Sequence, residues 1–329
     1  MKIKTIGFLL AIGIILIGSP VGCKSKKVEL KDEHFFDIES EEESSVNQVE
    51  KTIYDIKKGT MTDYNNIVKG DNEPFVLVKF IDENIKGVTE EEAIEMIMRL
   101  EEIQEGYKEL YTDELFTEGY QMELLRLSEV VQPNNLLFDE DHIEEIKNGD
   151  LKELVQKLID GKYKLINIEG GFYPIIDYEA LKDYDEYISE EIRDYIHIRS
   201  MDSNKPAALD AELRITFDEL SERLIETENY ILKYPSGKKY EELLRLYGTY
   251  LGFYIGGLDN SPIYDHETKI ITDDVLNSYK KIIRGKDTKT SQVVTKYMAI
   301  IDENENKIDG SVLAEGLNLK NQVIDELKK

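Results

Sequence analysis

The chain has 329 residues, 41% hydrophobic and 33% charged, an ordinary globular balance that excludes collagen-like and wholly disordered proteins. Its 68 acidic residues outnumber 41 basic ones, for a net charge of −27, which argues against nucleic acid as a partner because phosphate contacts need basic patches. The single cysteine excludes an internal disulfide, a cysteine-built zinc site and an iron–sulfur cluster.

The first 23 residues have the order of an export signal. Two lysines precede an apolar stretch over residues 5–18, which is shorter than the roughly 20 residues that a membrane-spanning helix needs. Small residues follow, and then Cys23, the only cysteine of the chain. This arrangement resembles the signal of bacterial lipoproteins, in which signal peptidase II cuts just before a cysteine that receives a diacylglyceryl group.

The lipoprotein resemblance implies a signal peptide at 1–22 and a protein anchored in membrane lipid through acylated Cys23. Its location would then be the extracytoplasmic face of the cell membrane. Several acyl chains on one residue make such an anchor stable. The alternatives are an ordinary secretory signal followed by a free thiol, or an anchor that is not cut.

An acidic stretch follows the predicted signal. Between residues 28 and 50 the chain carries nine acidic residues and one lysine, with almost no apolar periodicity. Such a composition cannot bury enough apolar surface to offset the entropy of ordering, so it predicts a flexible, self-repelling tether. We therefore predict a lipid-anchored acidic tether over 23–70 and a folded part that begins near Asp71.

Helix signals recur through an N-terminal helical region predicted over 71–160. The apolar run over 74–87 fits a helix or a strand, and Thr89 with Glu92 has the spacing of a capping box. Apolar positions after Thr89 share one helical face. Gly149 and Gly161 stand where left-handed C-caps belong. Further helices are predicted over 113–131, 140–147 and 151–159.

Residues 162–177 break the helical pattern and predict a β-hairpin. Gly170 and Gly171 permit the positive φ that a two-residue hairpin turn requires. Pro174 would then need an edge position, because it has no N–H to donate. Helices are predicted to resume over 178–184, 190–201 and 206–233. The predicted fold class is mainly α, a helical bundle or stacked helical hairpins with this one small β-hairpin.

The last predicted region, 161–329, also holds a degenerate repeat. A helix leads through a turn at 233–237 into a second helix that reaches Tyr247, and this order recurs through a turn at 284–287 into a helix that reaches Tyr297. The pattern resembles tetratricopeptide-type helical hairpins of bacterial envelope proteins, although its period and signature differ from that family. The resemblance implies groove-like binding surfaces rather than reaction centres.

Two features of the repeat region are candidate binding sites. The loop over 256–262 is rich in turn formers, and its Asp259 and Asn260 either bond local backbone or serve a partner. Four tyrosines at helical spacing share one face, which either packs against neighbouring helices or binds a peptide or glycan. These tyrosines are Tyr240, Tyr247, Tyr250 and Tyr254.

No catalytic residue, metal site or cofactor is predicted. The sequence has no Gly-x-Ser-x-Gly motif and no glycine-rich phosphate loop. Residues 302–310 resemble the start of a calcium loop, but Lys307 replaces the required glycine and Leu313 the bidentate glutamate. For glycosidase chemistry, which needs two carboxylates, Glu169 at the hairpin tip is a candidate acid, and Asp177 and Glu179 lie nearby in sequence.

These features favour a binding or adaptor module for an envelope protein over an enzyme. An acidic surface steers basic partners toward it. A cell-wall hydrolase with paired carboxylates is one alternative. A substrate-binding lipoprotein for a transporter is another, although such proteins usually alternate strands and helices and this sequence does not.

Overall fold

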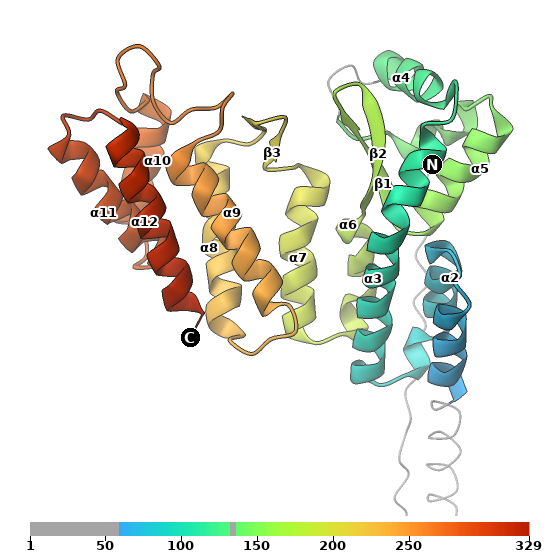
Figure 1. Ribbon diagram of the computed structural model, residues 1–329. Helices are drawn as coiled ribbons and strands as arrows, with labels where there is room; N and C mark the ends of the chain where they lie inside the picture. Colours follow the sequence, from blue (N-terminus) through green and yellow to red (C-terminus); the bar gives the residue numbers. More distant parts are fainter. Residues whose placement is uncertain (1–58, 132–135, 329) are drawn as a thin grey trace, which may run out of the picture. The chain divides into compact units, whose positions relative to one another are not determined.

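A computed structural model describes residues 59–131 and 136–328 (Figure 1). The described chain is mostly helical, and its strands form two small antiparallel sheets, so the predicted mainly α class with a small β-hairpin is confirmed. The described residues all belong to one compact unit. Cys23 and the larger part of the predicted tether lie outside the described residues.

The folded part begins earlier than Asp71. Residues 59–69 are helical, within the range predicted for the tether. Met61 and Tyr64, one helical turn apart, are buried in the core, and the Tyr64 hydroxyl donates to the Met96 carbonyl at 2.8 Å. The acidic composition of the preceding residues hid this apolar pair.

The helices that follow begin at recognisable caps. The predicted box is present, since Thr89 accepts from the Glu92 N–H while the Glu92 carboxylate accepts from the Thr89 N–H at 2.8 Å. The helices of this part are α2 (Pro74–Asn84), η1 (Ile85–Gly87), α3 (Glu90–Leu115), α4 (Tyr120–Val131), η2 (Glu140–Glu145) and α5 (Gly149–Asp160).

Three predicted boundaries here were wrong. The helix predicted over 113–131 is divided, because Gly119 takes a φ of 89° and separates α3 from α4. Gly149 opens α5 instead of closing a helix, since Asn148 caps the first turn. Gly161 ends α5 with a φ of −82°, and the left-handed residue is the next one, Lys162.

The predicted hairpin is confirmed as β1 (Tyr163–Ile168) paired with β2 (Gly171–Ile176). Its turn places Glu169 and Gly170 at φ 51° and 83°, one residue earlier than the two glycines suggested. Pro174 lies opposite Leu165 in a two-stranded sheet, where every strand is an edge.

Both outer edges of the hairpin are hydrogen-bonded to neighbouring segments. Along β1, the Leu165 carbonyl accepts from the Phe138 N–H at 2.9 Å, and the Asn167 N–H donates to the Leu136 carbonyl. Along β2, the Gln121 side chain accepts from the Phe172 N–H at 2.7 Å and donates to its carbonyl at 3.1 Å. The Gln121 amide on α4 therefore makes the two backbone hydrogen bonds that a neighbouring strand would make.

The C-terminal part begins with α7 and several short elements on either side of it. The single helix predicted over 206–233 was wrong, because its first residues form a small hairpin. A turn at Asp210 and Ala211, both with positive φ, folds residues 208–213 into a second small hairpin. A capping box at Thr216 then starts α8. The elements are α6 (Tyr178–Leu181), η3 (Lys182–Tyr187), α7 (Glu190–Asn204), β3 (Ala208–Leu209), β4 (Glu212–Leu213) and α8 (Phe217–Lys233).

The predicted helical hairpins are present. They pair α8 with α9 (Tyr240–Gly256) and α10 (Asp273–Arg284) with α11 (Lys289–Glu303), and α12 (Gly310–Leu327) packs on α9 and α11 (Figure 1). The segment that resembled a calcium loop is the cap of α12, because Asp309 accepts from the N–H groups of Ser311 and Val312. The Ser311 hydroxyl and these backbone groups lower the pKa of the Asp309 carboxyl to about 2.

Candidate binding cavity

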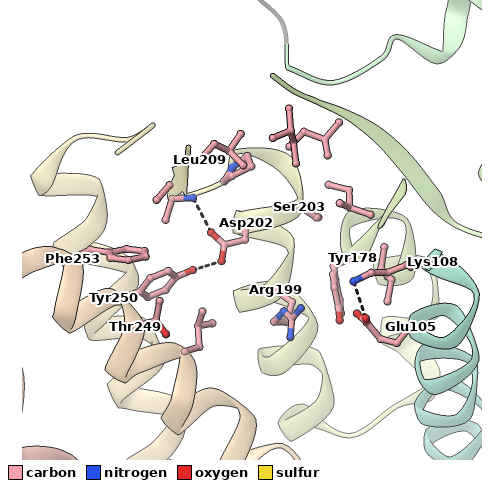
Figure 2. Close-up of a pocket in the computed structure, with 18 residues that line it drawn as sticks. Glu105, Lys108, Tyr178, Arg199, Asp202, Ser203, Leu209, Thr249, Tyr250 and Phe253 are labelled. Carbon is pink, nitrogen blue, oxygen red and sulfur yellow. Dashed lines mark hydrogen bonds and ion pairs between the residues drawn. The ribbon is translucent and has the colours of Figure 1, made fainter. Parts of the chain in front are cut away.

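A cavity of about 320 Å³ lies between the β1–β2 hairpin, α3, α7 and α9 (Figure 2). Most of its lining is apolar. The hairpin contributes Ile166, Ile168 and Ile175, the segment after α7 contributes Pro206 to Leu209, and α9 contributes Leu246 and Phe253. A cavity with apolar walls and few polar groups is the usual form of a ligand or peptide site.

Three helices line the cavity, and on each of them the lining residues follow one another at intervals of about one helical turn. On α9 the lining positions are 246, 249, 250 and 253, on α7 they are 199, 202 and 203, and on α3 they are 105 and 108. Spacings of three and four residues keep side chains on one helical face, so each helix turns a single stripe toward the cavity.

The Asp202 carboxylate in the cavity is fully engaged by the protein. It accepts from the Arg223 guanidinium at 2.6 Å, from the Tyr250 hydroxyl at 2.6 Å and from the Ala207 N–H at 3.1 Å. These bonds tie the end of α7 to α8 and α9 and fix the chain that leads to β3. Asp202 therefore shapes the cavity wall rather than offering a free carboxylate.

Beside the cavity, a charged cluster joins α3, α6, α7 and α9. In it Glu101 pairs with Lys239 at 2.5 Å, and Lys239 also pairs with Glu242 at 3.0 Å. The Arg199 guanidinium bonds Glu242 and lies 4.7 Å from the centre of the Tyr178 ring. The members of the charged cluster are Glu101, Tyr178, Tyr195, Arg199, Lys239 and Glu242.

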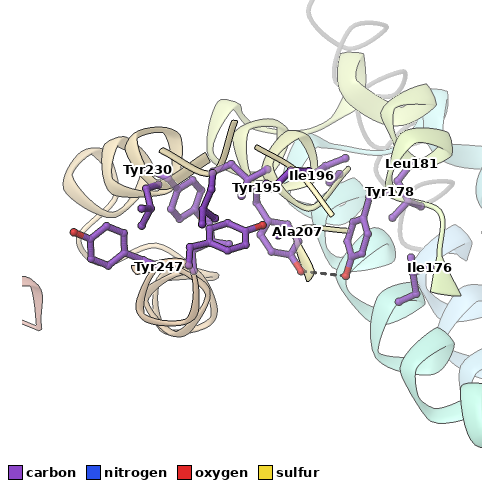
Figure 3. Packing of buried hydrophobic residues seen from close by; sticks show 14 of the residues in the cluster. Ile176, Tyr178, Leu181, Tyr195, Ile196, Ala207, Tyr230 and Tyr247 are labelled. Carbon is purple, nitrogen blue, oxygen red and sulfur yellow. Dashed lines mark hydrogen bonds between the residues drawn. The ribbon is translucent and has the colours of Figure 1, made fainter. Parts of the chain in front are cut away.

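Two tyrosines complete the charged cluster from within the core (Figure 3). Tyr178 donates to Glu101 at 2.6 Å, and Tyr195 bonds Glu101 and, at 2.8 Å, Glu242. Burial, reinforced by the neighbouring Glu101 carboxylate, raises the pKa of both hydroxyls far above the usual range, so they remain protonated donors. Burial alone would raise the pKa of Glu242, but Lys239 and Arg199 outweigh it and lower that pKa.

The four predicted tyrosines lie in the interior. Tyr247, Tyr250 and Tyr254 are at most 1% exposed and Tyr240 is 9% exposed, so they form no open aromatic face. Each hydroxyl bonds inside the protein: Tyr247 to Thr290 at 3.0 Å, Tyr254 to Ser278 at 2.8 Å, Tyr250 to Asp202 and Tyr240 to the Leu327 carbonyl. Their position fits the packing alternative, and of the four only Tyr250 lines the cavity.

Asp259 and Asn260 are exposed, on a loop away from this cavity. Asn260 donates from its side chain to the Asp210 carbonyl at 2.9 Å and from its N–H to the Ala211 carbonyl at 3.0 Å. The loop thereby holds the turn of the β3–β4 hairpin, a contact between segments that are about 50 residues apart. The structure does not bring the two residues together with the tyrosines.

The sequence did not single out the charged cluster or Asp202. Each helix carries its members at helical spacing, but this spacing equally describes a solvated face. Only the packing of α3, α7 and α9 shows that these charges meet one another. The one local signal was Tyr195 with Arg199, an aromatic and a cation four residues apart on α7.

The described carboxylates of the cavity and of the charged cluster are held by cations. Glu105 pairs with Lys108 at 2.7 Å, and Asp202, Glu101 and Glu242 are paired as above. Glu169 is exposed at the hairpin turn, while Asp177 pairs with Lys164 at 2.9 Å. Within 59–131 and 136–328, no group of three His, Cys, Asp or Glu side chains is placed to hold a metal ion.

No family model, curated protein or solved structure matches this chain. None of the helices that the structure describes combines the length and apolar character needed to span a bilayer.

Proposed function

We propose that this protein is a membrane-anchored extracytoplasmic lipoprotein whose helical unit binds a protein of the cell envelope in the cavity between the hairpin, α7 and α9. The observation that carries the proposal is the chemistry of the cavity. Its walls are apolar, and its carboxylates are bonded to cations of the same chain. Such a cavity favours binding through the burial of apolar groups, and it offers no free carboxylate for a reaction.

A hydrolase with paired carboxylates is the less favoured function. General acid catalysis needs a carboxyl group whose pKa is raised and which faces a second carboxylate across a substrate. In the cavity, Glu105 and Asp202 each have the charged nitrogen of a cation within 2.7 Å, so neither carboxylate is free to face a substrate.

The anchor is tested by replacing Cys23 with serine. We expect the variant to leave the membrane fraction and appear in the soluble extracytoplasmic fraction, because an acyl anchor needs the thiol. The measurement is fractionation of cells followed by immunoblotting, with metabolic labelling by a palmitate analogue as the second readout. Retention of the variant in membranes, or labelling of it, would contradict the anchor.

Binding in the cavity is tested by site-specific cross-linking in intact cells. A photoreactive phenylalanine analogue is placed at Leu209 or at Ile175, which line the cavity, and at Ala299, which is exposed on α11. We expect one adduct of the same mass from the two cavity positions and none from position 299. Equal adducts from all three positions, or no adduct from any, would overturn the proposed binding site.

A further inference from the structure

We infer that the occupant of the cavity is an extended polypeptide segment that combines an apolar anchor side chain with flanking lysine or arginine residues. This inference rests on the proposed function and adds the chemistry of the partner. It is carried by the shape of the apolar surface and by the charges that border it.

The apolar surface continues beyond the cavity along one face of the hairpin. Ile166, in the cavity wall, lies directly opposite Tyr173 in the sheet, and the Tyr173 ring lies 5.2 Å from the ring of Phe116. Phe116 is 48% exposed, although it is a large apolar side chain. A surface that runs from an open cavity to an aromatic pair with one exposed ring suits an extended chain better than a compact small molecule.

Three acidic residues are direct chain neighbours of lining residues, so they belong to the border of the cavity. Glu109 follows the lining residue Lys108 on α3, Glu169 follows Ile168 in the hairpin turn, and Asp210 follows Leu209 in the next turn. All three are exposed, and none of them forms an ion pair with another described residue. The cations nearby are already used, because Lys108 pairs with Glu105 and Arg214 pairs with Glu212 at 2.5 Å.

These three carboxylates favour a bound segment with positive charge. Free negative charge around an apolar cavity repels acidic segments and attracts basic ones, and this effect adds to the steering by the net charge of −27. The cavity itself adds little charge of its own, since Asp202 with Arg223 and Glu105 with Lys108 are balanced pairs. In the bound segment, the apolar anchor side chain therefore makes the buried contact, and the flanking basic residues orient the segment on the protein.

Arg199 supplies a donor at the inner side of the cavity. Its guanidinium stacks on Tyr178, and Nη1 is the nitrogen that bonds Glu242. Stacking leaves the edge of a guanidinium plane available for donation. Because Glu242 and Glu101 already balance Arg199 and Lys239, the group it would meet is a neutral backbone carbonyl of the bound segment.

Three labelled peptides of equal length test this chemistry. The first is Lys-Lys-Ser-Leu-Ile-Phe-Ser-Lys-Lys, the second has glutamate in place of every lysine, and the third keeps the lysines but has serine at the apolar positions. Binding to the full folded chain is measured by fluorescence anisotropy at two salt concentrations. We expect saturable 1:1 binding of the first peptide, weakening as salt rises, and at least tenfold weaker binding of the other two.

Matched variants locate the binding. Ala208→Trp fills the cavity and is expected to abolish binding of the first peptide, whereas Ala299→Trp, the same change on the exposed face of α11, is expected to leave it intact. Circular dichroism confirms that both variants are folded.

A charge series tests the border. Neutralising Glu109, Glu169 and Asp210 together, as Gln, Gln and Asn, is expected to weaken binding of the first peptide about tenfold. The control neutralises three exposed carboxylates that are not chain neighbours of any lining residue, and it should have a much smaller effect. These are Glu83, Glu95 and Glu303, each replaced by Gln.

The outcomes separate this inference from the proposed function. Equal binding of the third peptide, or binding that survives Ala208→Trp, would mean that the protein attracts any basic chain, and would overturn the inference. Equal binding of the acidic peptide would overturn the role of the border. If no peptide binds while cross-links persist at Leu209 and Ile175, the occupant has a different chemistry but the binding site stands. If the cross-links also fail, the proposed function fails.

Discussion

Replacing Glu228 with alanine is expected to lower the free energy of unfolding by about 4 kcal/mol, because it leaves several buried donors without an acceptor. Glu228 is 1% exposed on α8. It accepts from the N–H groups of Lys289 and Thr290 at 2.6 and 2.8 Å and from the Thr290 hydroxyl at 2.6 Å. The carboxylate thus caps α11, and the positive end of the helix dipole takes the place of a cation.

The size of this effect is measured by urea unfolding of three variants. Glu228→Gln keeps the shape and one acceptor oxygen, so its loss should be smaller, about 2 kcal/mol. Glu222→Gln, on the same helix with its side chain 66% exposed, is the control and should change stability by less than about 0.5 kcal/mol. A Glu228→Ala variant as stable as this control would contradict the capping role.

The second large effect is expected from Lys239→Met in the charged cluster. The side chains of Lys239 and Glu101 are only 12% and 8% exposed, and their charged atoms are 2.5 Å apart. Removing the ammonium leaves Glu101 buried without its cation, since Arg199 is bonded to Glu242. Breaking a buried pair in this way costs about 3 kcal/mol.

A double-mutant cycle isolates the pair. Glu101→Gln alone should also destabilise, but the double variant Lys239→Met with Glu101→Gln should lose at least about 1 kcal/mol less than the sum of the two single losses. Losses that simply add would show that the two charges do not interact in the folded protein.

The deficit of the Lys239→Met variant should also depend on pH. In the wild type the pKa of Glu242 is lower than its usual value of 4.5, so its contribution to stability is complete above that value and is lost as the pH falls through the folded pKa. The difference between wild type and variant should therefore be constant above about pH 5 and shrink below it. A difference that grows in acid would contradict this assignment.

Local signals predicted much of the fold. The Thr89 capping box, the paired glycines of the hairpin and the turn that ends in Gly237 each belong to a few consecutive residues, and the structure has helices and strands where they indicated. The start of α8 was missed, although Thr216 and Glu219 carry the same capping spacing, because the residues before them also suit a helix.

The candidate site depended on contacts that no local pattern encodes. Glu101 and Lys239 are 138 residues apart, and Glu228 and Thr290 are 62 apart. In a chain with 68 acidic residues, nothing in the sequence marks which few are buried. The tyrosines at helical spacing could be identified in the sequence, but the same spacing is found on buried and on exposed helix faces. Which side of α9 is buried depends on tertiary packing, because α8 and α12 cover it.

The bonding of Gln121 to Phe172 has a consequence for how copies of this protein meet one another. A free strand edge can recruit a strand from a neighbouring copy and seed aggregation. Here Gln121 bonds the N–H and the carbonyl of Phe172, and Pro174, two residues further along β2, has no N–H to donate. Residues 136–138 pair with the opposite edge, along β1. The backbone edges of the hairpin are therefore closed to strand pairing between identical copies.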